Sequence, residues 1–246
     1  MVTPASRLYP YPPSLTPVQA AAVPLVFLTA WVCLFETGHA RPGDVLLVLG
    51  AGGGVGTAAV QLAVARGLRV VGTAGDARKR AFVVDEFGAE ACFDSRADWE
   101  SEVRGLLGPE RVDIALDPVG GKATAACSRL LAPLGRLVFY GFSSAMPTSK
   151  ASLIQAAVAW MRTPRFHPLS LVPRNLGVHG MALFGLGHKE PLLRIALDSV
   201  FRDIVDGRMR PVIDRVLPFD RTGAVQAHTH LHDRKNLGKV VLSDLA

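Results

Sequence analysis

The sequence predicts an α/β fold, a doubly wound parallel sheet with helices on both faces. The stretch VLLVLGAGGGVGTAAVQLAVARG, residues 45–67, runs from apolar β-forming residues through five glycines into an alanine-rich segment. After it, β-type and helix-type segments alternate along residues 69–141. Because the connections between them are short, the strands are expected to run parallel, with helices crossing both faces of the sheet.

The individual elements follow from local patterns. An apolar run over residues 20–35 predicts a buried helix, and the alanine-rich segment after the glycines predicts a helix that ends before Gly67. Short aliphatic runs predict the strands, and longer mixed segments between them predict the helices. After the strand at 45–49, strands are expected at 69–73, 91–94, 112–117, 136–141 and 178–185, and helices near 79–87, 99–107, 122–131, 154–161 and 191–206.

The last part of the chain has a different character. A strand at 212–219, a helix near 221–231 and a strand at 238–244 form a β-α-β end that does not continue the earlier period. This end predicts a second structural unit. Before it, an insertion with several prolines over residues 149–173 is expected to be either a substrate lid or an oligomer contact.

The glycine-rich turn is the main candidate for function. A helix that starts directly after a strand leaves its first N–H groups unpaired, and these groups attract an anion. Gly50, Gly53 and Gly56 recur every third residue, and Ala51, Gly53 and Gly56 fit the dinucleotide-binding fingerprint with alanine in its first place. The motif alone leaves open a tight turn that binds no ligand.

Composition narrows the possible classes. With 246 residues, 49% of them hydrophobic, the chain is long enough for one large core or two modest domains. Its three separated cysteines support neither a disulfide framework nor a four-cysteine zinc site, so the cytoplasm is the expected location. The 16-residue run at 20–35 is too short for a membrane span. The formal charge of +6 favours a phosphorylated ligand, whereas scattered basic residues without aromatics argue against nucleic acid.

The residues after the second strand favour NADP(H) over NAD(H). An acidic residue usually holds the ribose hydroxyls of NAD at this position, and a 2′-phosphate requires basic groups instead. Here Gly75 stands where the acid is expected, Asp76 follows, and the basic run 78–80 comes next. Asp76 leaves NAD(H) open as the alternative.

Three further features each have a structural and a functional reading. Asp117 ends a predicted strand and is expected to cap the turn rather than relay protons. Tyr140 is expected to pack against a helix rather than donate a proton. The HTHLH segment at 228–232 falls in a predicted helix, where alternate side chains point about 200° apart, so surface histidines are expected rather than a metal site.

Five phrases carry a family resemblance. They are VPLVFLTAWVCLFE (23–36), RPGDVLLVLGAGGGVGTAAVQLA (41–63), DPVGG (117–121), GRLVFYGFSS (135–144) and NLGKVVL (236–242). In order and spacing they resemble the zinc-independent quinone oxidoreductases of the medium-chain dehydrogenase/reductase superfamily, and residues 163–184 resemble the synaptic-vesicle amine-transport-protein homologue branch of it.

The resemblance implies an NADPH-dependent reductase of quinones, enones or similar electrophilic small molecules, which transfers a hydride without a metal. It places the pyrophosphate on the turn, the 2′-phosphate near Gly75 and Lys79, and the nicotinamide beside Thr29. Where this branch commonly has a tyrosine after the third strand, the sequence has Ser95, which puts that aromatic contact in question. The cofactor-binding residues so implied are Thr29, Gly50, Gly53, Gly54, Val55, Gly56, Gly75, Lys79, Ser95, Val119, Gly141, Phe142, Ser143 and Arg234.

The resemblance also implies a domain division. Residues 1–26 would be the remnant of a GroES-like catalytic domain, 27–210 the Rossmann domain that binds NADP(H), and 211–246 the return to the catalytic domain. Most of that catalytic domain precedes the equivalent of Val2 in the family. The chain is therefore expected to be a fragment of a reductase, one half of a split reductase, or a non-catalytic NADP(H)-binding module.

Partners are expected for the same reason. The predicted strand at 178–185 would lie at a sheet edge, which needs cover and suggests a homodimer. A second polypeptide that supplies the missing catalytic domain is the alternative.

Overall fold

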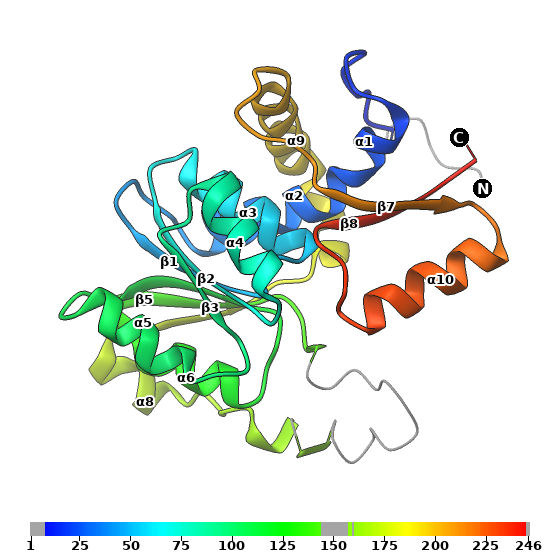
Figure 1. The fold of residues 1–246 in the computed structure, drawn as a ribbon. Helices are drawn as coiled ribbons and strands as arrows, with labels where there is room; N and C mark the ends of the chain where they lie inside the picture. Colours follow the sequence, from blue (N-terminus) through cyan, green and yellow to red (C-terminus); the bar gives the residue numbers. More distant parts are fainter. Residues whose placement is uncertain (1–7, 144–156, 159, 245–246) are drawn as a thin grey trace.

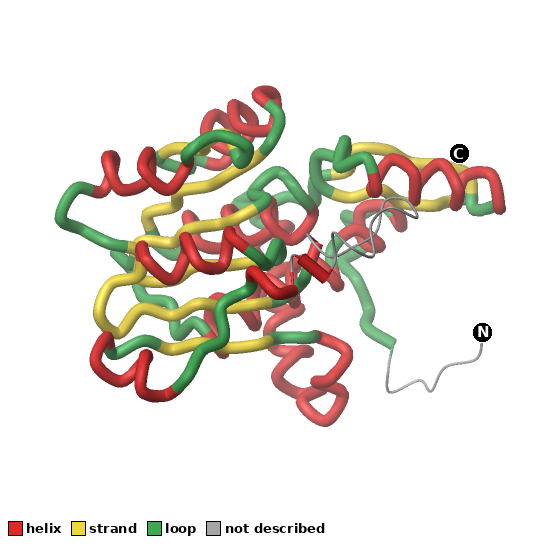
Figure 2. The backbone as a smooth tube through the Cα atoms, turned by 90° about the horizontal axis from the view of Figure 1, so that it is seen from below, coloured by secondary structure: helices red, strands yellow, loops and turns green. Residues whose placement is uncertain are grey.

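The computed structural model describes residues 8–143, 157–158 and 160–244. Its main feature is a six-stranded sheet in the order β3-β2-β1-β4-β5-β6, and every neighbouring pair is parallel (Figures 1 and 2). The strands are β1 (Val45–Leu49), β2 (Arg69–Ala74), β3 (Ala91–Asp94), β4 (Val112–Asp117), β5 (Leu131–Phe139) and β6 (Gly177–Gly180). The strand order reverses between β1 and β4, so the doubly wound parallel sheet is confirmed.

Helices cover both faces of this sheet (Figure 1). Alternate residues of β1 enter different cores: Leu46 and Val48 face one, and Leu47 and Leu49 face the other. This alternation follows from the two-residue period of a strand, and burial on both sides explains why β1 is apolar throughout. The helices on the first face are α3 (Gly54–Val64), α4 (Ala77–Phe87) and α9 (Glu190–Val205), and those on the second are α5 (Trp99–Leu107) and α6 (Lys122–Leu130).

The apolar run near the N-terminus is helical but divided. It forms α1 (Pro17–Ala22), α2 (Pro24–Trp31) and the π-helical turn η2 (Val32–Thr37) instead of the single helix expected at 20–35. Thr16 begins α1 with a capping box, and Pro24 starts α2, because proline fits the first turn of a helix better than its interior.

This divided run is longer than the apolar segment that predicted it. From Pro17 to Thr37 it spans 21 residues, and its most apolar 18-residue window has a mean hydropathy of 2.0, so by length and composition alone it could cross a membrane. However, 61% of its most apolar window is buried inside the protein, where α2 packs on α3 and α9. A helix buried in a protein core can be equally long and apolar, so length and composition alone are weak evidence for a membrane span.

Two expectations after β5 are altered. The strand expected at 178–185 ends at Gly180, because its neighbour β5 ends at Phe139. Beyond this point β5 offers one more acceptor, the Phe139 carbonyl, which binds the Met181 N–H. The chain then continues as the 3₁₀ segment η5 (Leu183–Lys189). Residues 154–156 and 159 of the helix expected at 154–161 lie outside the described residues, and residues 157, 158, 160 and 161 are helical. Short helical turns, α8 (Pro168–Leu171) and η4 (Val172–Arg174), precede β6.

A separate two-stranded sheet is formed near the C-terminal end of the described chain. Strands β7 (Ile213–Pro218) and β8 (Lys239–Ser243) are parallel and are joined by α10 (Arg221–His232). Helix α1, from the other end of the chain, packs against both strands. Figures 1 and 2 show this two-stranded sheet beside the larger one. This arrangement accounts for the break in the sequence pattern after α9.

Candidate functional site

The turn between β1 and α3 has the backbone geometry of an anion-binding site. Gly50 adopts a φ of +68°, and the Ala51 N–H donates to the Thr73 carbonyl of β2 at 2.9 Å. Gly53 occupies the N-cap of α3, so no side chain caps this helix. Its first N–H groups therefore lack the acceptor that a serine or aspartate would supply, and they stay available to an anion.

Gly56 allows the helix to approach this turn. A Cβ on Gly56 would lie 2.3 Å from the Gly50 carbonyl oxygen and 2.7 Å from the Ala51 Cα, both within the backbone. The third position of the fingerprint therefore needs glycine for steric reasons, as the sequence predicts.

The segment just before β8 contacts the glycine turn from the C-terminal part of the chain, which we call the C-terminal unit (β7, α10 and β8). The Gly238 N–H donates to the Gly52 carbonyl at 2.9 Å, and Gly53 pairs with Gly238 in an isolated parallel bridge. Gly238 has a φ of +79°, and a Cβ there would lie 2.4 Å from the Val212 carbonyl oxygen. The sequence shows Gly238 only as part of a family phrase, because its contact partner Gly52 lies 186 residues earlier in the chain.

The carboxyl ends of β4 and β5 form the floor next to the turn. The Ser143 N–H donates to the Pro118 carbonyl at 2.8 Å, and a Cβ on Gly141 would lie 3.2 Å from that same oxygen. Val119 and Phe142 lie in these two loops and are partly exposed. The two loops expected to line the nicotinamide ribose are therefore brought together through Pro118.

Arg234 joins this floor to the glycine turn. Its guanidinium donates to the Ser143 carbonyl at 3.1 Å, and its own carbonyl accepts a hydrogen bond of 2.6 Å from Lys79 Nζ. The side chain of Lys79 lies across Gly52, with Cβ 2.8 Å from the position of a Cβ there. Burial lowers the pKa of Lys79, and the Asp76 and Asp214 carboxylates oppose this shift. Lys79 thus supports the turn.

Basic groups gather at the ends of β2 and β3. A Cβ on Gly75 would lie 3.3 Å from Ser95 Oγ and 3.9 Å from Arg96 Nε. Asp94 binds Arg96 through two 3.2 Å hydrogen bonds, which lower the Asp94 pKa to about 2. Asp76 accepts from the Lys79 N–H and caps α4. The sequence analysis assigned no role to Arg96, because its place beside Gly75 follows from strand pairing.

Thr29 contributes a buried hydroxyl on α2. Its side chain is 7% exposed, and within the described part of the chain no hydrogen bond of the hydroxyl is found. Val26, one turn earlier on α2, contacts the start of α3, with Cγ1 3.0 Å from the position of a Cβ on Gly54. A buried hydroxyl without a partner is costly, so a polar ligand group beside α2 is favoured.

Taken together, the residues fit a nicotinamide dinucleotide. Unpaired N–H groups suit a pyrophosphate, and Arg96 and Ser95 offer donors where a 2′-phosphate would lie. The glycine turn follows β1, and Gly75, Ser95, Val119 and residues 141–143 follow the carboxyl ends of β2, β3, β4 and β5. The other three predicted site residues lie outside the sheet: Thr29 on α2, Lys79 on α4 and Arg234 after α10.

The other candidates of the sequence analysis have structural roles. Asp117 is fully buried and accepts from Val119 N at 2.7 Å, Gly120 N at 3.0 Å and Thr124 Oγ1 at 2.6 Å, which fixes the turn after β4. Tyr140 packs against the first core, and burial raises its pKa, which makes it a weaker proton donor.

The three histidines lie on α10, but only His228 and His232 are exposed as expected, whereas His230 is partly buried. His230 Nε2 lies 2.6 Å from Asp214 Oδ2 on β7, and both side chains are nearly buried. Among residues 8–143, 157–158 and 160–244, no cluster of three or more His, Cys, Asp or Glu residues could hold a metal ion. The described residues therefore do not fit a zinc site.

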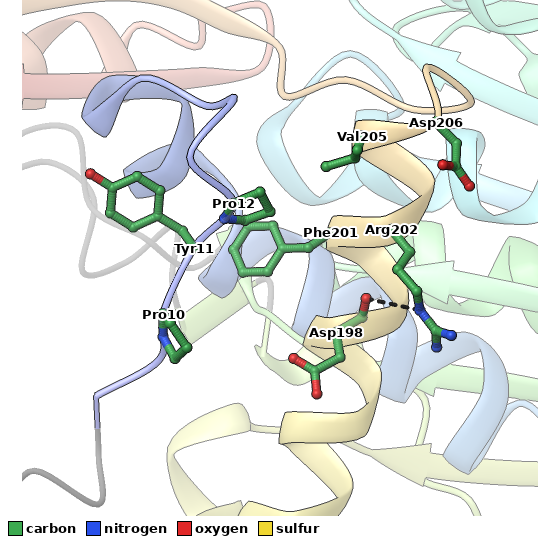
Figure 3. A pocket seen from close by; sticks show the side chains of 8 residues that line it. All are labelled: Pro10, Tyr11, Pro12, Asp198, Phe201, Arg202, Val205 and Asp206. Carbon is green, nitrogen blue, oxygen red and sulfur yellow. Dashed lines mark hydrogen bonds between the residues drawn. The ribbon is translucent and has the colours of Figure 1, made fainter.

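A surface pocket of about 410 Å³ lies elsewhere, between the N-terminal segment and α9 (Figure 3). Arg202 donates there to the Asp198 carbonyl of its own helix at 3.4 Å. The pocket is lined by Pro10, Tyr11, Pro12, Asp198, Phe201, Arg202, Val205 and Asp206. None of these belongs to the predicted cofactor site, and the shallow glycine turn rather than this pocket carries the recognisable chemistry.

The fold and the turn define a Rossmann-type α/β protein, and comparison with known proteins narrows the class. Residues 54–175 match the family described as zinc-binding dehydrogenase. The synaptic vesicle membrane protein VAT-1 homolog of Danio rerio is 33% identical over 99% of this chain, and the match spans 50% of that protein.

Two solved structures are also similar. The quinone oxidoreductase of Thermus thermophilus, described with its NADPH complex, is 35% identical, with a TM-score of 0.78 and coverage of 98% of this chain and 71% of the other. Mycobacterial Rv1454c, complexed with NADPH, is 27% identical, with a TM-score of 0.82 and coverage of 98% and 70%.

The chain belongs to the quinone oxidoreductase family of the medium-chain dehydrogenase/reductase superfamily. Members of this family are oxidoreductases, and solved relatives bind NADPH. The chain spans 50% of the length of the Danio rerio relative.

Proposed function

We propose that the chain binds NADP(H) at the glycine turn and serves the reduction of quinones, enones or similar activated double bonds. The uncapped start of α3, closed in by Gly56 and bridged by Gly238, is the observation that carries this proposal. The NADPH complexes of two relatives support it.

The choice of NADP(H) over NAD(H) rests on the partners of the two nearby carboxylates, Asp76 and Asp94. Asp76 caps α4, and Asp94 is paired with Arg96 and with Arg80 at 3.1 Å. No carboxylate replaces Gly75, where the ribose hydroxyls of NAD would need one. A 2′-phosphate would instead meet Ser95 and the exposed Arg96 guanidinium.

In the proposed reaction the protein orients the reactants and excludes water. When bound, NADPH supplies a hydride to an electrophilic carbon. Thr29 would hold the carboxamide end of the nicotinamide with its unpaired hydroxyl, and the Val119 and Ser143 loops would fix the ribose. Quinones and enones are already polarised, so the reaction does not depend on a Lewis acid, and the described residues offer no ligand cluster for one.

A non-catalytic NADP(H)-binding or partner-requiring module is the alternative. The small sheet favours it: only β7 and β8 pair in this sheet within the described chain, and Val216 of β7 and Phe219 just after β7 are 47% and 66% exposed. A second polypeptide that supplies the rest of a catalytic domain would cover this sheet. A homodimer through β6, the outermost strand beside β5, remains our proposal for the other edge.

The location that we propose is the cytoplasm. Cys33, Cys92 and Cys127 are free cysteines, which fits a reducing compartment.

NADPH oxidation tests the proposed function. The purified chain is mixed with NADPH and a simple quinone, and absorbance at the nicotinamide wavelength is followed, with NADH in parallel. Quinone-dependent loss of NADPH would support the reductase. Tight NADPH binding without turnover would favour the non-catalytic or partner-requiring module, and no binding of either cofactor would refute both.

A further inference from the structure

Lys239 lies directly against the glycine turn, although it is far from it in the sequence. It is the first residue of β8 and follows Gly238, which pairs with Gly53. Its Cδ lies 3.2 Å from the position of a Cβ on Gly54, the first residue of α3. Lys79 lies across Gly52 in a similar way, with Cδ 3.0 Å from the position of a Cβ there. Two lysine side chains, from α4 and β8, therefore flank the turn.

The two lysines differ in their partners. Lys79 Nζ donates to the Arg234 carbonyl and is influenced by two carboxylates. In the described part of the chain, Lys239 Nζ makes no hydrogen bond or ion pair. Burial lowers the pKa of Lys239, and no neighbouring charge opposes this shift. A partly buried ammonium group without an acceptor is costly, which favours an anion beside it.

The start of α3 favours the same kind of ligand. The N–H groups at Gly54 and the following residues are uncapped, and the positive end of the helix dipole lies here. Val26 of α2 contacts the same position on Gly54, with Cγ1 at 3.0 Å. Lys239 thus lies on the α2 side of the turn, the side on which Thr29 is found.

We propose that Lys239 binds the pyrophosphate of the dinucleotide, at the phosphate on the α2 side of the turn. This inference rests on the proposed cofactor binding. The ammonium group of Lys239 complements the backbone N–H groups, which alone carry only partial charge. Because Lys239 belongs to β8, the bound cofactor also ties the C-terminal unit to the Rossmann sheet.

The test uses variants that separate charge from packing. Lys239→Met keeps the aliphatic part that packs on Gly54 and removes the charge, and Lys239→Arg restores a cation. Lys189→Met, at the exposed N-cap of α9, is the matched control. Urea unfolding of each variant verifies that it is folded. Binding of NADPH and NADH is then measured by titration of cofactor fluorescence.

We expect Lys239→Met to weaken the binding of NADPH and of NADH by the same factor, about 10- to 100-fold. This factor corresponds to the loss of one charge-assisted hydrogen bond. The factor is equal because both cofactors contain the pyrophosphate. Lys239→Arg should recover most of the affinity, and Lys189→Met should bind like the unmodified chain.

Three outcomes would overturn the inference. If the unmodified chain binds NADPH and Lys239→Met binds it equally well, the inference is wrong and the proposed function stands. If only NADPH binding weakens, Lys239 contacts the 2′-phosphate instead of the pyrophosphate. If the unmodified chain binds neither cofactor, the proposed function and this inference both fail.

Discussion

Two glycine-to-alanine substitutions, Gly56→Ala and Gly105→Ala, test the geometry of the turn. Both glycines lie inside helices, α3 and α5, so both substitutions gain about 1 kcal/mol of helix propensity. Their surroundings are opposite. A Cβ on Gly56 would lie 2.3 Å from a carbonyl oxygen, 0.7 Å inside the 3.0 Å that real Cβ atoms keep, whereas a Cβ on Gly105 would meet nothing within 4 Å.

The expected effects therefore have opposite signs. Overpacking costs about 1–3 kcal/mol, and at Gly56 the obstructing atoms are backbone, so the upper part of this range is expected. After the propensity gain, Gly56→Ala should lower the free energy of unfolding by about 1–2 kcal/mol, and Gly105→Ala should raise it by roughly 0.5–1 kcal/mol.

Urea unfolding followed by circular dichroism measures both changes, and a thermal scan should show shifts of about 2–4 °C per kcal/mol for a chain of this size. NADPH titration of the same variants should show loss of binding only for Gly56→Ala, because α3 must move away from the turn. If Gly56→Ala is as stable as the unmodified chain and binds NADPH normally, then the conclusion that the close packing of α3 on the turn requires glycine at position 56 is wrong.

Three further outcomes are expected. Asp117→Ala removes a buried acceptor of three hydrogen bonds and should lower the free energy of unfolding by about 3 kcal/mol, measured with urea; an unchanged midpoint would contradict this role. Arg96→Gln should reduce the preference for NADPH over NADH about tenfold, and NMR titration should show the Asp94 pKa rising from about 2 toward its usual value. Because the folded-state pKa of Asp94 is depressed, its stabilising effect is present above the ordinary carboxyl pKa and is lost as the pH falls toward 2. The thiols of Cys33 and Cys92, with pKa values raised by burial to about 12, should resist iodoacetamide at pH 8 until the chain is denatured; rapid labelling of the folded chain would refute this.

Much of the fold could be predicted because the relevant information is local. The helix at 99–107 and the strand at 112–117 have the predicted bounds. Asp98 caps that helix through the Ser101 N–H, and Gly108 ends it, so both limits are encoded within a few residues. The glycine turn was predictable for the same reason, since its backbone conformation requires glycine.

The errors arise where tertiary neighbours decide. The strand expected at 178–185 stops at Gly180 because β5 ends beside it, which no local pattern reveals. The helix expected at 20–35 is divided at Pro24, and β5 begins at Leu131 rather than at Arg136. In the site, the roles of Arg96, Gly238 and Lys239 depend on contacts between segments far apart in sequence. The sequence contains these residues but does not show that they meet.

The central claim is that the glycine turn binds a nicotinamide dinucleotide, and calorimetric titration of the purified chain with NADPH and NADH tests it most directly. The account predicts saturable binding of one NADPH per chain, at least about tenfold tighter than NADH, as expected for one additional charged contact. It also predicts that Gly56→Ala abolishes this binding. Absence of saturable binding up to millimolar NADPH, or equal binding by Gly56→Ala, would contradict it.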